Sequence, residues 1–273
     1  MTERDTTSEA LASDVDAARA GDRQALERVV QGVQDDIFRL AMRMTGCPDD
    51  ARDACQEILI KVVTRLDSFR GEASVRTWAY RIAVRHLLDR KKSRVEELAM
   101  SFERFGPDLL DGLTDPQSPA DPVMVEEVKL GCTLAMLTCL DREHRFAYVL
   151  GDVFDLSPHD AAELCAITED AYRQRLSRAR RALETFTETF CGLVNEQAPC
   201  RCDKRVARAE ELGRIERGRP RLAHAEAREA TREMESLHDT ARLMRAHPEY
   251  VAPTDVIEGV RAALDGGKSR ILG

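Results

Sequence analysis

Apolar residues recur at intervals of three and four along most of this chain, which is the spacing of one face of an α-helix. The clearest stretch is 25–46, whose apolar face is formed by Val29, Val33, Ile37, Leu40 and Met44. This pattern stops at Gly46, with Pro48 just beyond, as helices commonly do. Because no stretch alternates convincingly with the period of a strand, the fold is predicted to be all-α.

A second helix is predicted from Asp49 or Asp50 to about residue 69, and a third begins after the loop RGEAS, at Ser74 or Thr77. At helical spacing the third helix has one apolar face and an adjacent basic stripe, formed by Val75, Ala79, Ile82 and His86 and by Arg81, Arg85 and Lys92. Trp78 lies on the border, so its ring can pack inward and still stack on a base. A core Trp beside a solvated basic face is the competing interpretation.

The segment 101–122 is different, because it is rich in Asp, Pro and Gly and has no helical period. This composition is typical of a flexible, acidic linker. Short helices are predicted again from residue 123 onward, and the stretch from 191 to the end is a charged, mostly helical extension. This extension has an apolar stripe, which needs a partner surface and is expected to pack back on one of the preceding domains. The stripe includes Leu222, Ala225, Met234, Leu237, Ala241 and Met244.

Residues 156–183 have the pattern of a helix-turn-helix. Ser157 can cap a first helix that starts at Pro158, and after a short turn Thr168 can cap a second one. The second helix has a core side of Tyr172, Leu176, Ala179, Leu183 and Phe186 and an outer side of Arg173, Gln174, Ser177, Arg178 and Arg181. Arg and Gln on an outer face are the side chains that read guanine and adenine in a major groove.

Composition narrows the function classes. The 273 residues carry a net charge of -8, which argues against a protein that coats nucleic acid but leaves room for local basic clusters. No apolar run approaches the roughly 18 residues that span a bilayer, and the first residues lack the apolar core of a signal peptide. A cytoplasmic protein without membrane insertion is therefore expected.

Eight cysteines in a reducing compartment are expected to be thiols rather than disulfides. Five of them are interpreted as small apolar packing residues: Cys47, Cys55, Cys132, Cys139 and Cys165. Cys191, Cys200 and Cys202 crowd together beside basic residues, and they are candidate ligands of a zinc ion with a histidine such as His224, His238 or His247. Nearby cations would lower their thiol pKa, so a redox switch is a second interpretation, and no special chemistry is a third.

The stretches DDARDACQE, FRGEASVRTWAYRIA and AITEDAYRQRLSRARRAL, in this order, resemble the extracytoplasmic-function (ECF) sigma factors, small promoter-specificity subunits of bacterial RNA polymerase. The resemblance implies a sigma region 2 at 12–96, a linker at 97–122 and a helix-turn-helix region 4 at 123–190. The remaining residues, 191–273, form a Cys-containing extension that is expected to regulate promoter or polymerase access. Core RNA polymerase and promoter DNA are the implied partners, an anti-sigma factor is a further candidate, and no cofactor is required.

The resemblance also implies three sets of site residues. The set for the minus-ten element is Phe69, Arg70, Gly71, Ser74, Trp78, Arg81 and Arg85. The set for the minus-thirty-five element is Arg173, Gln174, Ser177, Arg178 and Arg181. The set for docking on the polymerase clamp is Asp50, Asp53, Gln56 and Glu57. No catalytic residue is implied, because the polymerase supplies the chemistry.

Two residues depart from the family pattern. Arg85 stands where Asn is common, which leaves the preferred minus-ten base open, and Tyr172 stands where a smaller aliphatic residue is usual, which leaves the pitch of the recognition helix open. The linker is expected to mimic nucleic acid in a polymerase channel or to act as a solvated tether. Two rival classes are a stand-alone helix-turn-helix regulator and a thiol- or metal-dependent enzyme. The first leaves the acidic helix and the FRGEAS loop unexplained, and the second lacks a general base near the cysteines.

Overall fold

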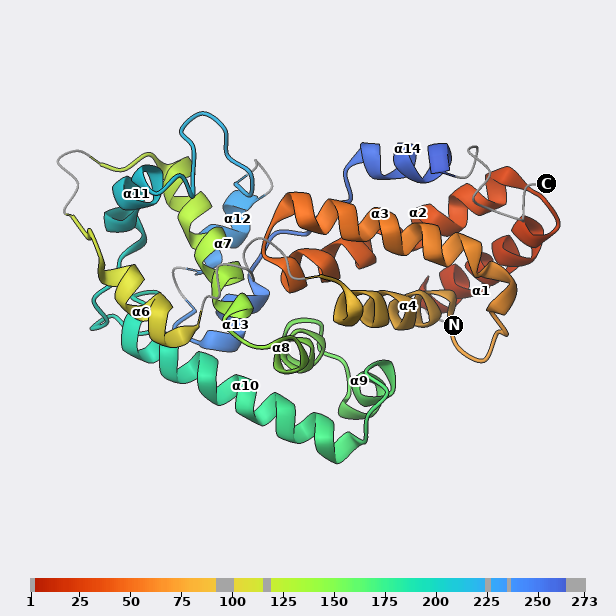
Figure 1. Ribbon diagram of the computed structural model, residues 1–273, viewed down its shortest axis with the longest axis horizontal. Coiled ribbons are helices and arrows are strands. Elements are labelled where there is room, and N and C mark those ends of the chain that lie inside the picture. Colours follow the sequence, from red (N-terminus) through yellow and green to blue (C-terminus); the bar gives the residue numbers. More distant parts are fainter. Residues whose placement is uncertain (1–2, 92–100, 115–118, 224–226, 235–236, 264–273) are drawn as a thin grey trace. The chain divides into compact units, whose positions relative to one another are not determined.

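The computed structural model of the protein describes residues 3–91, 101–114, 119–223, 227–234 and 237–263 (Figure 1). The regular structure in these ranges is helical, apart from one isolated bridge between Cys191 and Cys200. The prediction of an all-α fold is confirmed.

The chain divides into two compact units, and the first of them is discontinuous in sequence. Unit 1 contains Met1–Met42, Asp49–Lys91 and Tyr250–Gly273. Unit 2 contains Arg43–Pro48 and Lys92–Glu249. The C-terminal extension is thus shared, because its last part belongs to unit 1 and the rest belongs to unit 2.

Unit 1 is built around the helices that carry the strongest apolar pattern. Its elements are α1 (Glu3–Arg19), most of α2 (Arg23–Thr45), α3 (Pro48–Thr64), the 3-10 turn η1 (Leu66–Ser68), α4 (Val75–Asp89) and α14 (Thr254–Ala263). The predicted apolar face of α2 is buried, as are Ile58, Leu59 and Val62 of α3. The second predicted helix ends five residues early, at Thr64, and the chain then makes the η1 turn before the RGEAS loop.

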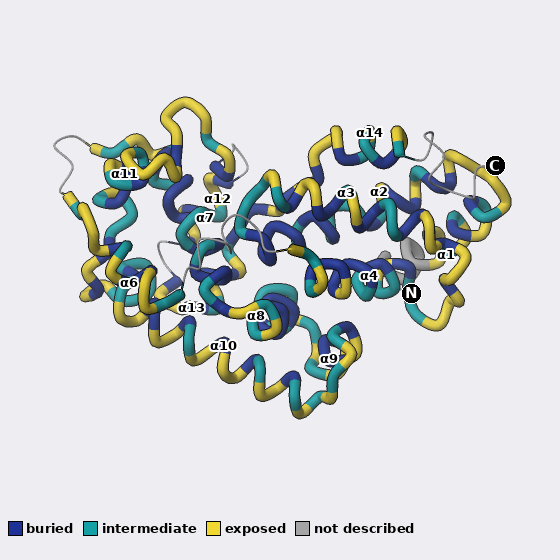
Figure 2. The backbone as a smooth tube through the Cα atoms, viewed as in Figure 1, coloured by how far each residue is buried: buried dark blue, intermediate teal, exposed yellow. Residues whose placement is uncertain are grey.

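Unit 2 contains the helix-turn-helix and most of the extension. Its elements are α6 (Phe102–Leu110), α7 (Pro122–Thr138), α8 (Arg142–Tyr148), the π-helical turn η2 (Val149–Val153), α9 (Pro158–Leu164), α10 (Glu169–Phe190), α11 (Cys202–Glu211), α12 (Ala227–Glu233) and α13 (Thr240–Arg245). Helix α10 packs chiefly on α8 and α9, and exposed positions recur along its length (Figure 2).

The expected linker contains a helix, so the prediction of a segment without regular structure is wrong for residues 102–110. Helix α6 forms because its aromatic residues face α10 and bury themselves there. The rings of Phe102, Phe105 and Phe190 all lie 5.0 to 5.5 Å from the ring of Phe186, measured between centroids. Residues 97–100 and 115–118 of the expected linker lie outside the described ranges.

The extension packs on unit 2 through buried polar contacts with α7. The carboxylate of Glu127 accepts backbone N–H bonds from Arg221, Leu222 and Ala223 at 2.7 to 2.9 Å. Thr133 Oγ1 lies 2.6 Å from His247 Nε2. Leu222, Met234, Leu237 and Met244 of the predicted apolar stripe are buried, which confirms that the stripe has a partner surface, while Ala225 lies outside the described residues.

A buried guanidinium holds the turn between α7 and α8. Arg145 is 2% exposed and donates hydrogen bonds to the carbonyls of Leu137, Thr138 and Leu140 at 2.9 to 3.0 Å. These carbonyls lie at and just beyond the C-terminal end of α7, where the last C=O groups have no partner within the helix. Arg145 therefore fixes the start of the helix-turn-helix against α7.

Replacing Arg145 with Met keeps much of the apolar stem but removes every donor. Because four backbone carbonyls, those three and that of Met44, then lose a charged partner, the free energy of unfolding is expected to fall by about 3 kcal/mol or more. Arg178→Met, on the exposed side of α10, is the matched control. Urea unfolding followed by circular dichroism measures both, and equal midpoints would show that Arg145 does not hold this turn.

Candidate functional site

The FRGEAS loop of unit 1 presents an exposed tip on a buried aromatic base. Phe69 is buried and packs edge-on against Trp78, with ring centroids 5.6 Å apart and an interplanar angle of 61°. Arg70 and Gly71 are exposed. Gly71 has φ +72°, and no atom lies within 4 Å of where a side chain would start. The tip thus leaves room for a partner to approach the backbone.

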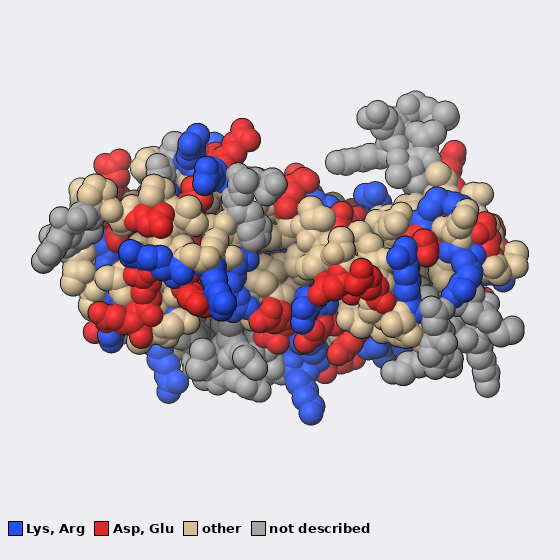
Figure 3. Space-filling model, turned by 90° about the horizontal axis from the view of Figure 1, so that it is seen from above, with Lys and Arg blue, Asp and Glu red and all other residues tan. Residues whose placement is uncertain are grey.

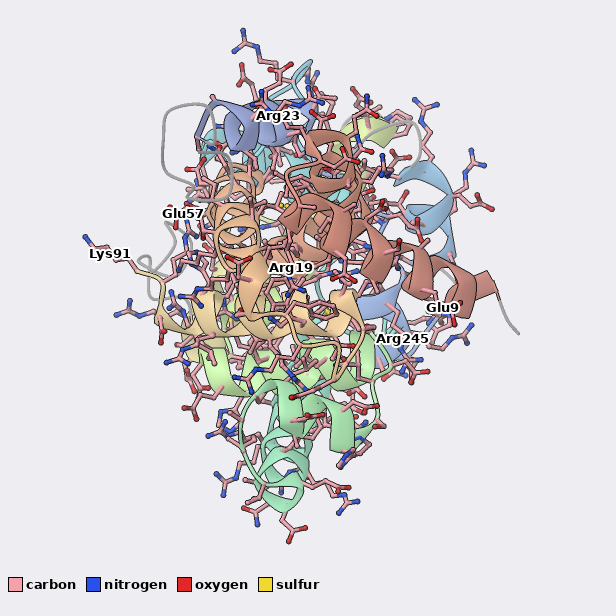
Figure 4. The ribbon with its side chains drawn as sticks, turned by 90° about the vertical axis from the view of Figure 1, so that its right-hand side faces the viewer. Glu9, Arg19, Arg23, Glu57, Lys91 and Arg245 are labelled. Atoms are coloured by element: carbon pink, nitrogen blue, oxygen red, sulfur yellow. The ribbon has the colours of Figure 1, made fainter. Side chains whose placement is uncertain are left out.

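The side chain of Arg19, at the end of α1, holds the start of this loop in place through hydrogen bonds to backbone carbonyls. Its Nη2 donates to the carbonyls of Leu66, at 2.7 Å, and Phe69, and its Nε donates to Leu66 at 3.2 Å. Figure 4 labels Arg19 on α1. Sequence reasoning missed this residue, because nothing in the spacing of α1 says that a terminal arginine reaches a segment nearly fifty positions away.

Helix α4 follows the loop directly. Ser74 is its N-cap, since its hydroxyl accepts the N–H of Thr77 at 3.0 Å, so Ser74 holds the loop in place in addition to any contact with DNA. Trp78 and Arg81 are half-buried and Arg85 is exposed. The structure therefore brings the seven predicted minus-ten residues together on one loop and the helix behind it.

The four predicted polymerase-contacting residues lie on α3 in different surroundings. Asp50 forms a half-buried ion pair with Arg90 at 3.6 Å, while Asp53 is exposed beside Arg52. Glu57, labelled in Figure 4, is exposed and lies 3.3 Å from His86. Gln56 is half-buried, because Gly259 of α14 packs against its side chain.

His86 connects α3 to α4 inside unit 1. It is 7% exposed, and its Nδ1 lies 2.6 Å from Lys61 Nζ, so it is a hydrogen-bonded structural residue, as the apolar side of the helix predicted. Burial, followed by the charges of Lys61 and Arg90, lowers the pKa of His86 to about 4. The imidazole is therefore neutral in the folded protein at pH 7.

The helix-turn-helix of unit 2 has the predicted caps. The Ser157 hydroxyl accepts the N–H of Asp160 at 3.1 Å, and the Thr168 hydroxyl accepts the N–H of Ala171 at 3.2 Å. Ala166, in the turn, has the left-handed φ of +54°. The predicted minus-thirty-five residues are all exposed on α10: Arg173, Gln174, Ser177, Arg178 and Arg181.

Charge on the recognition side of α10 is partly balanced within the helix. Arg173 forms ion pairs with Glu169 and, at 3.6 Å, with Asp170 in the first turn. Both pairs are at the surface, where such pairs contribute little and are easily exchanged for a phosphate. On the face seen in Figure 3, acidic and basic side chains are interspersed, which agrees with local basic positions in an acidic chain.

Tyr172 is accommodated by a small residue in the preceding turn. Its side chain is fully buried, and its hydroxyl donates to the carbonyl of Ala147 at 2.8 Å. A side chain on Gly151 would start 2.7 Å from this hydroxyl. Gly151 lies in the π-helical turn η2. Because this position has no side chain, the ring of Tyr172 fits inside the unit and does not have to be exposed.

The C-terminal cysteines gather around one small cavity, together with a residue that the sequence interpretation had placed alone. Cys132 of α7 lines this cavity with Cys191, Cys200 and Cys202. Burial raises the pKa of all four thiols, in the case of Cys200 to about 11, and outweighs the opposite effect of Arg201 and Arg205. The expectation that nearby cations lower these thiol pKa values is therefore wrong, because desolvation is the larger effect.

The zinc hypothesis gains no support from this geometry. Within the described ranges, no group of three or more His, Cys, Asp or Glu side chains is arranged to hold a metal ion. Of the candidate fourth ligands, His247 bonds to Thr133 and His238 lies near Glu196, while His224 is outside the described residues. Zinc binding by Cys191, Cys200 and Cys202 stays a prediction, which metal analysis of anaerobically purified protein tests.

Comparisons with known proteins identify the class of both units. A family model described as sigma-70 region 2 matches residues 29–96, and one described as sigma-70 region 4 matches residues 130–183. Both matched regions are regions of the sigma-70 family, so the chain is similar to this family over residues 29–96 and 130–183.

Two curated relatives and one solved structure show how much of each chain is similar. The ECF RNA polymerase sigma factor SigW of Bacillus subtilis is 29% identical over 171 residues, which are 60% of this chain and 90% of SigW. The RNA polymerase sigma-H factor of Pseudomonas aeruginosa is 29% identical over 176 residues, which are 62% of this chain and 90% of the relative. The sigma factor RpoE of Bartonella quintana, solved with the anti-sigma factor NepR, aligns with a TM-score of 0.39 at 20% identity, over 57% of this chain and 91% of RpoE.

Neither family model extends into 191–273, so the extension lies outside the matched regions. Among the described helices, none is long and apolar enough to cross a membrane.

The lowered pKa of His86 predicts a specific loss of stability in acid. The unfolded chain binds a proton below its ordinary pKa of 6.5, whereas the folded protein resists protonation down to about pH 4. Stability is therefore full above pH 6.5 and falls as the pH drops toward 4. Between pH 7.5 and pH 5 the wild type is expected to lose about 2 kcal/mol more than His86→Gln. Urea unfolding at both pH values measures this, and parallel losses would contradict it.

The raised thiol pKa values predict slow alkylation of the cysteine cavity. At pH 8, Cys132, Cys191, Cys200 and Cys202 are expected to react with iodoacetamide at least about tenfold more slowly than in the urea-unfolded chain, since only the thiolate is nucleophilic. Peptide mass spectrometry at timed intervals gives the rate for each cysteine. Equal rates in folded and unfolded protein would restore the redox-switch interpretation.

Proposed function

We propose that this chain is a promoter-specificity subunit that brings core RNA polymerase to its promoters and helps to open the minus-ten element. The observation that supports this most is that each unit exposes residues of one predicted DNA-binding set. The FRGEAS loop and α4 form the first surface, and the outer side of α10 forms the second. A regulator that only binds duplex DNA would need the second surface alone.

In this proposal the FRGEAS loop takes up a base flipped from the non-template strand. Gly71 leaves space for the strand, Arg70 supplies charge and hydrogen bonds, and Trp78 offers part of a ring that Phe69 holds in place. Stacking on an aromatic side chain contributes about 1 to 3 kcal/mol per base, which offsets the cost of unstacking. Arg19 positions the loop, so the captured base meets a preformed site.

Helix α10 holds the upstream element as intact duplex. Arg173, Gln174 and Arg178 lie toward the N-terminal half of the helix, which is the part that enters the major groove in helix-turn-helix proteins. Arg181 lies further along, where contact with phosphate is expected. The buried hydroxyl of Tyr172 fixes this helix against α8, so its pitch is set by a specific hydrogen bond.

The exposed acidic positions on α3 form the polymerase-docking surface in this proposal. Asp53 and Glu57 would meet basic side chains of the polymerase clamp, and Gln56 lies between them on the same helix. The chain itself performs no chemistry, because it supplies binding energy for the open strand while the polymerase forms the RNA bonds. It acts where the polymerase does, in the cytoplasm, and control by an anti-sigma factor stays a prediction.

Single-round transcription from a promoter library, with core RNA polymerase and purified protein, tests the proposal. Arg178→Ala is expected to reduce transcription from promoters with an intact minus-thirty-five element by about 5- to 150-fold, the value of one bidentate Arg contact. Arg219→Ala, an 80% exposed arginine outside α10, is the control and is expected to leave transcription unchanged.

Two outcomes would count against the proposal. Transcripts without any enrichment of promoter sequences would exclude sigma activity. Sequence-specific binding of duplex DNA without any binding to core polymerase would favour the stand-alone regulator instead.

A further inference from the structure

The last helix that the structure describes in the extension lies on α3, the proposed polymerase-docking helix of unit 1. Helix α14 runs beside α2 and α3 (Figure 1) and contacts both. Arg261 Nε lies 3.0 Å from Glu27 Oε1 on α2, and Asp255 Oδ2 lies 3.1 Å from Arg52 Nη1 on α3. Just before α14, the N–H of Ala252 donates to Asp35 Oδ1 at 2.9 Å. The segment therefore binds a defined surface of unit 1, which includes Glu27, Asp35 and Arg52 and is called its seat below.

Apolar burial and a close backbone approach complete this contact. Val256 is 0% exposed and Val260 is 2% exposed, so one side of α14 is covered. Gly259 lies between them on the helix, and a Cβ at this position would start 2.5 to 2.8 Å from the side-chain amide of Gln56. Only glycine lets α14 come this close to α3 without displacing Gln56.

The extension leaves the proposed functional surface of unit 2 exposed but contacts the proposed functional surface of unit 1. Helices α11, α12 and α13 pack on α7, η2 and α10, and they leave the DNA-facing residues Arg173 to Arg181 of α10 exposed. On α3, in contrast, α14 sits directly on Gln56 and pairs with Arg52, which is next to Asp53. Helix α14 thus covers the Gln56 part of the proposed polymerase-docking surface, where Asp53 and Glu57 stay exposed, rather than the proposed DNA surface of α10.

We propose that α14 competes with the polymerase clamp for α3, so that the protein carries its own inhibitor of polymerase binding. This inference rests on the proposed function of α3. Because a seated α14 and a docked clamp would both need the side chain of Gln56, the two states exclude each other. The apparent affinity for polymerase is then reduced by the fraction of molecules in which α14 is released.

The contacts of α14 are of the kind that allow a helix to dissociate and bind again. Ten residues are too few to hold an isolated helix in water, so α14 depends on its seat. The seat consists of two buried valines and a few polar contacts, of which the pairs Arg52–Asp255 and Arg261–Glu27 are exposed and individually weak. A partner that offers α3 a larger interface can therefore displace α14.

Two matched substitutions in the full-length chain test this. Val256→Asp places a charge in the buried side of α14, whereas Val251→Asp makes the same change at a position that is 64% exposed. Val256→Asp is expected to bind core RNA polymerase about tenfold more tightly than wild type, as it would if the helix is seated nine-tenths of the time. Val251→Asp is expected to match wild type. Fluorescence anisotropy of labelled protein against core polymerase measures the affinities, and circular dichroism checks that both variants fold.

A charge exchange away from α3 provides an independent test. Arg261→Glu is expected to raise the affinity for polymerase about two- to fivefold, since it removes one surface ion pair and adds repulsion with Glu27. Adding Glu27→Arg restores an attractive pair and is expected to return the affinity to the wild-type value. A merely structural loss would not be repaired by the second change.

The outcomes separate the two proposals. If wild type and all variants bind core polymerase equally, the polymerase function stands and competition by α14 is wrong. If Val256→Asp folds and binds more weakly than Val251→Asp, α14 supports docking rather than opposing it, and the inference is overturned. If no form of the protein binds core polymerase, the proposed function itself fails, and the inference fails with it.

Discussion

Helix α7 carries polar side chains into the interior of unit 2, and buried polar groups must be bonded to be tolerated. Glu127, Lys129 and Thr133 are all buried, and the C-terminal extension supplies partners for each. Three backbone N–H groups meet the carboxylate of Glu127, Lys129 reaches the carbonyl of Thr231 at 3.5 Å, and Thr133 meets His247. The extension is therefore part of the folded core of unit 2, and removing it would strand these groups.

The two parts of the extension are therefore held by different kinds of contact. Its first part is held in unit 2 by buried hydrogen bonds and buried apolar side chains. Its last part rests on unit 1 through α14, which has few buried contacts and several exposed ones. Contacts of low local stability are where conformational changes concentrate in proteins. The extension thus consists of a part that is firmly packed in unit 2, followed by α14, which can be released from unit 1.

Most of the helical fold was predictable, because apolar spacing and caps such as Ser157 and Thr168 act locally. The exposed side of α10 and the loop before Trp78 could be named for the same reason, although their roles in binding stay predictions. Arg19, Cys132 and Gly259 could not be found in this way. Each acts through a residue far away in sequence, and a periodic pattern carries no information about such pairs. Helix α6 was missed because Pro and Asp obscured the spacing of its phenylalanines.

Unit 1 is completed by residues from both ends of the chain, with nearly all of unit 2 encoded between them. A ribosome adds about 5 to 20 residues per second, so α3 is made about 10 to 40 seconds before α14 is complete. During that interval the nascent protein has its α3 surface without the helix that later covers it. The order of synthesis therefore gives every new molecule a brief period in which other proteins can bind α3 without competition from α14.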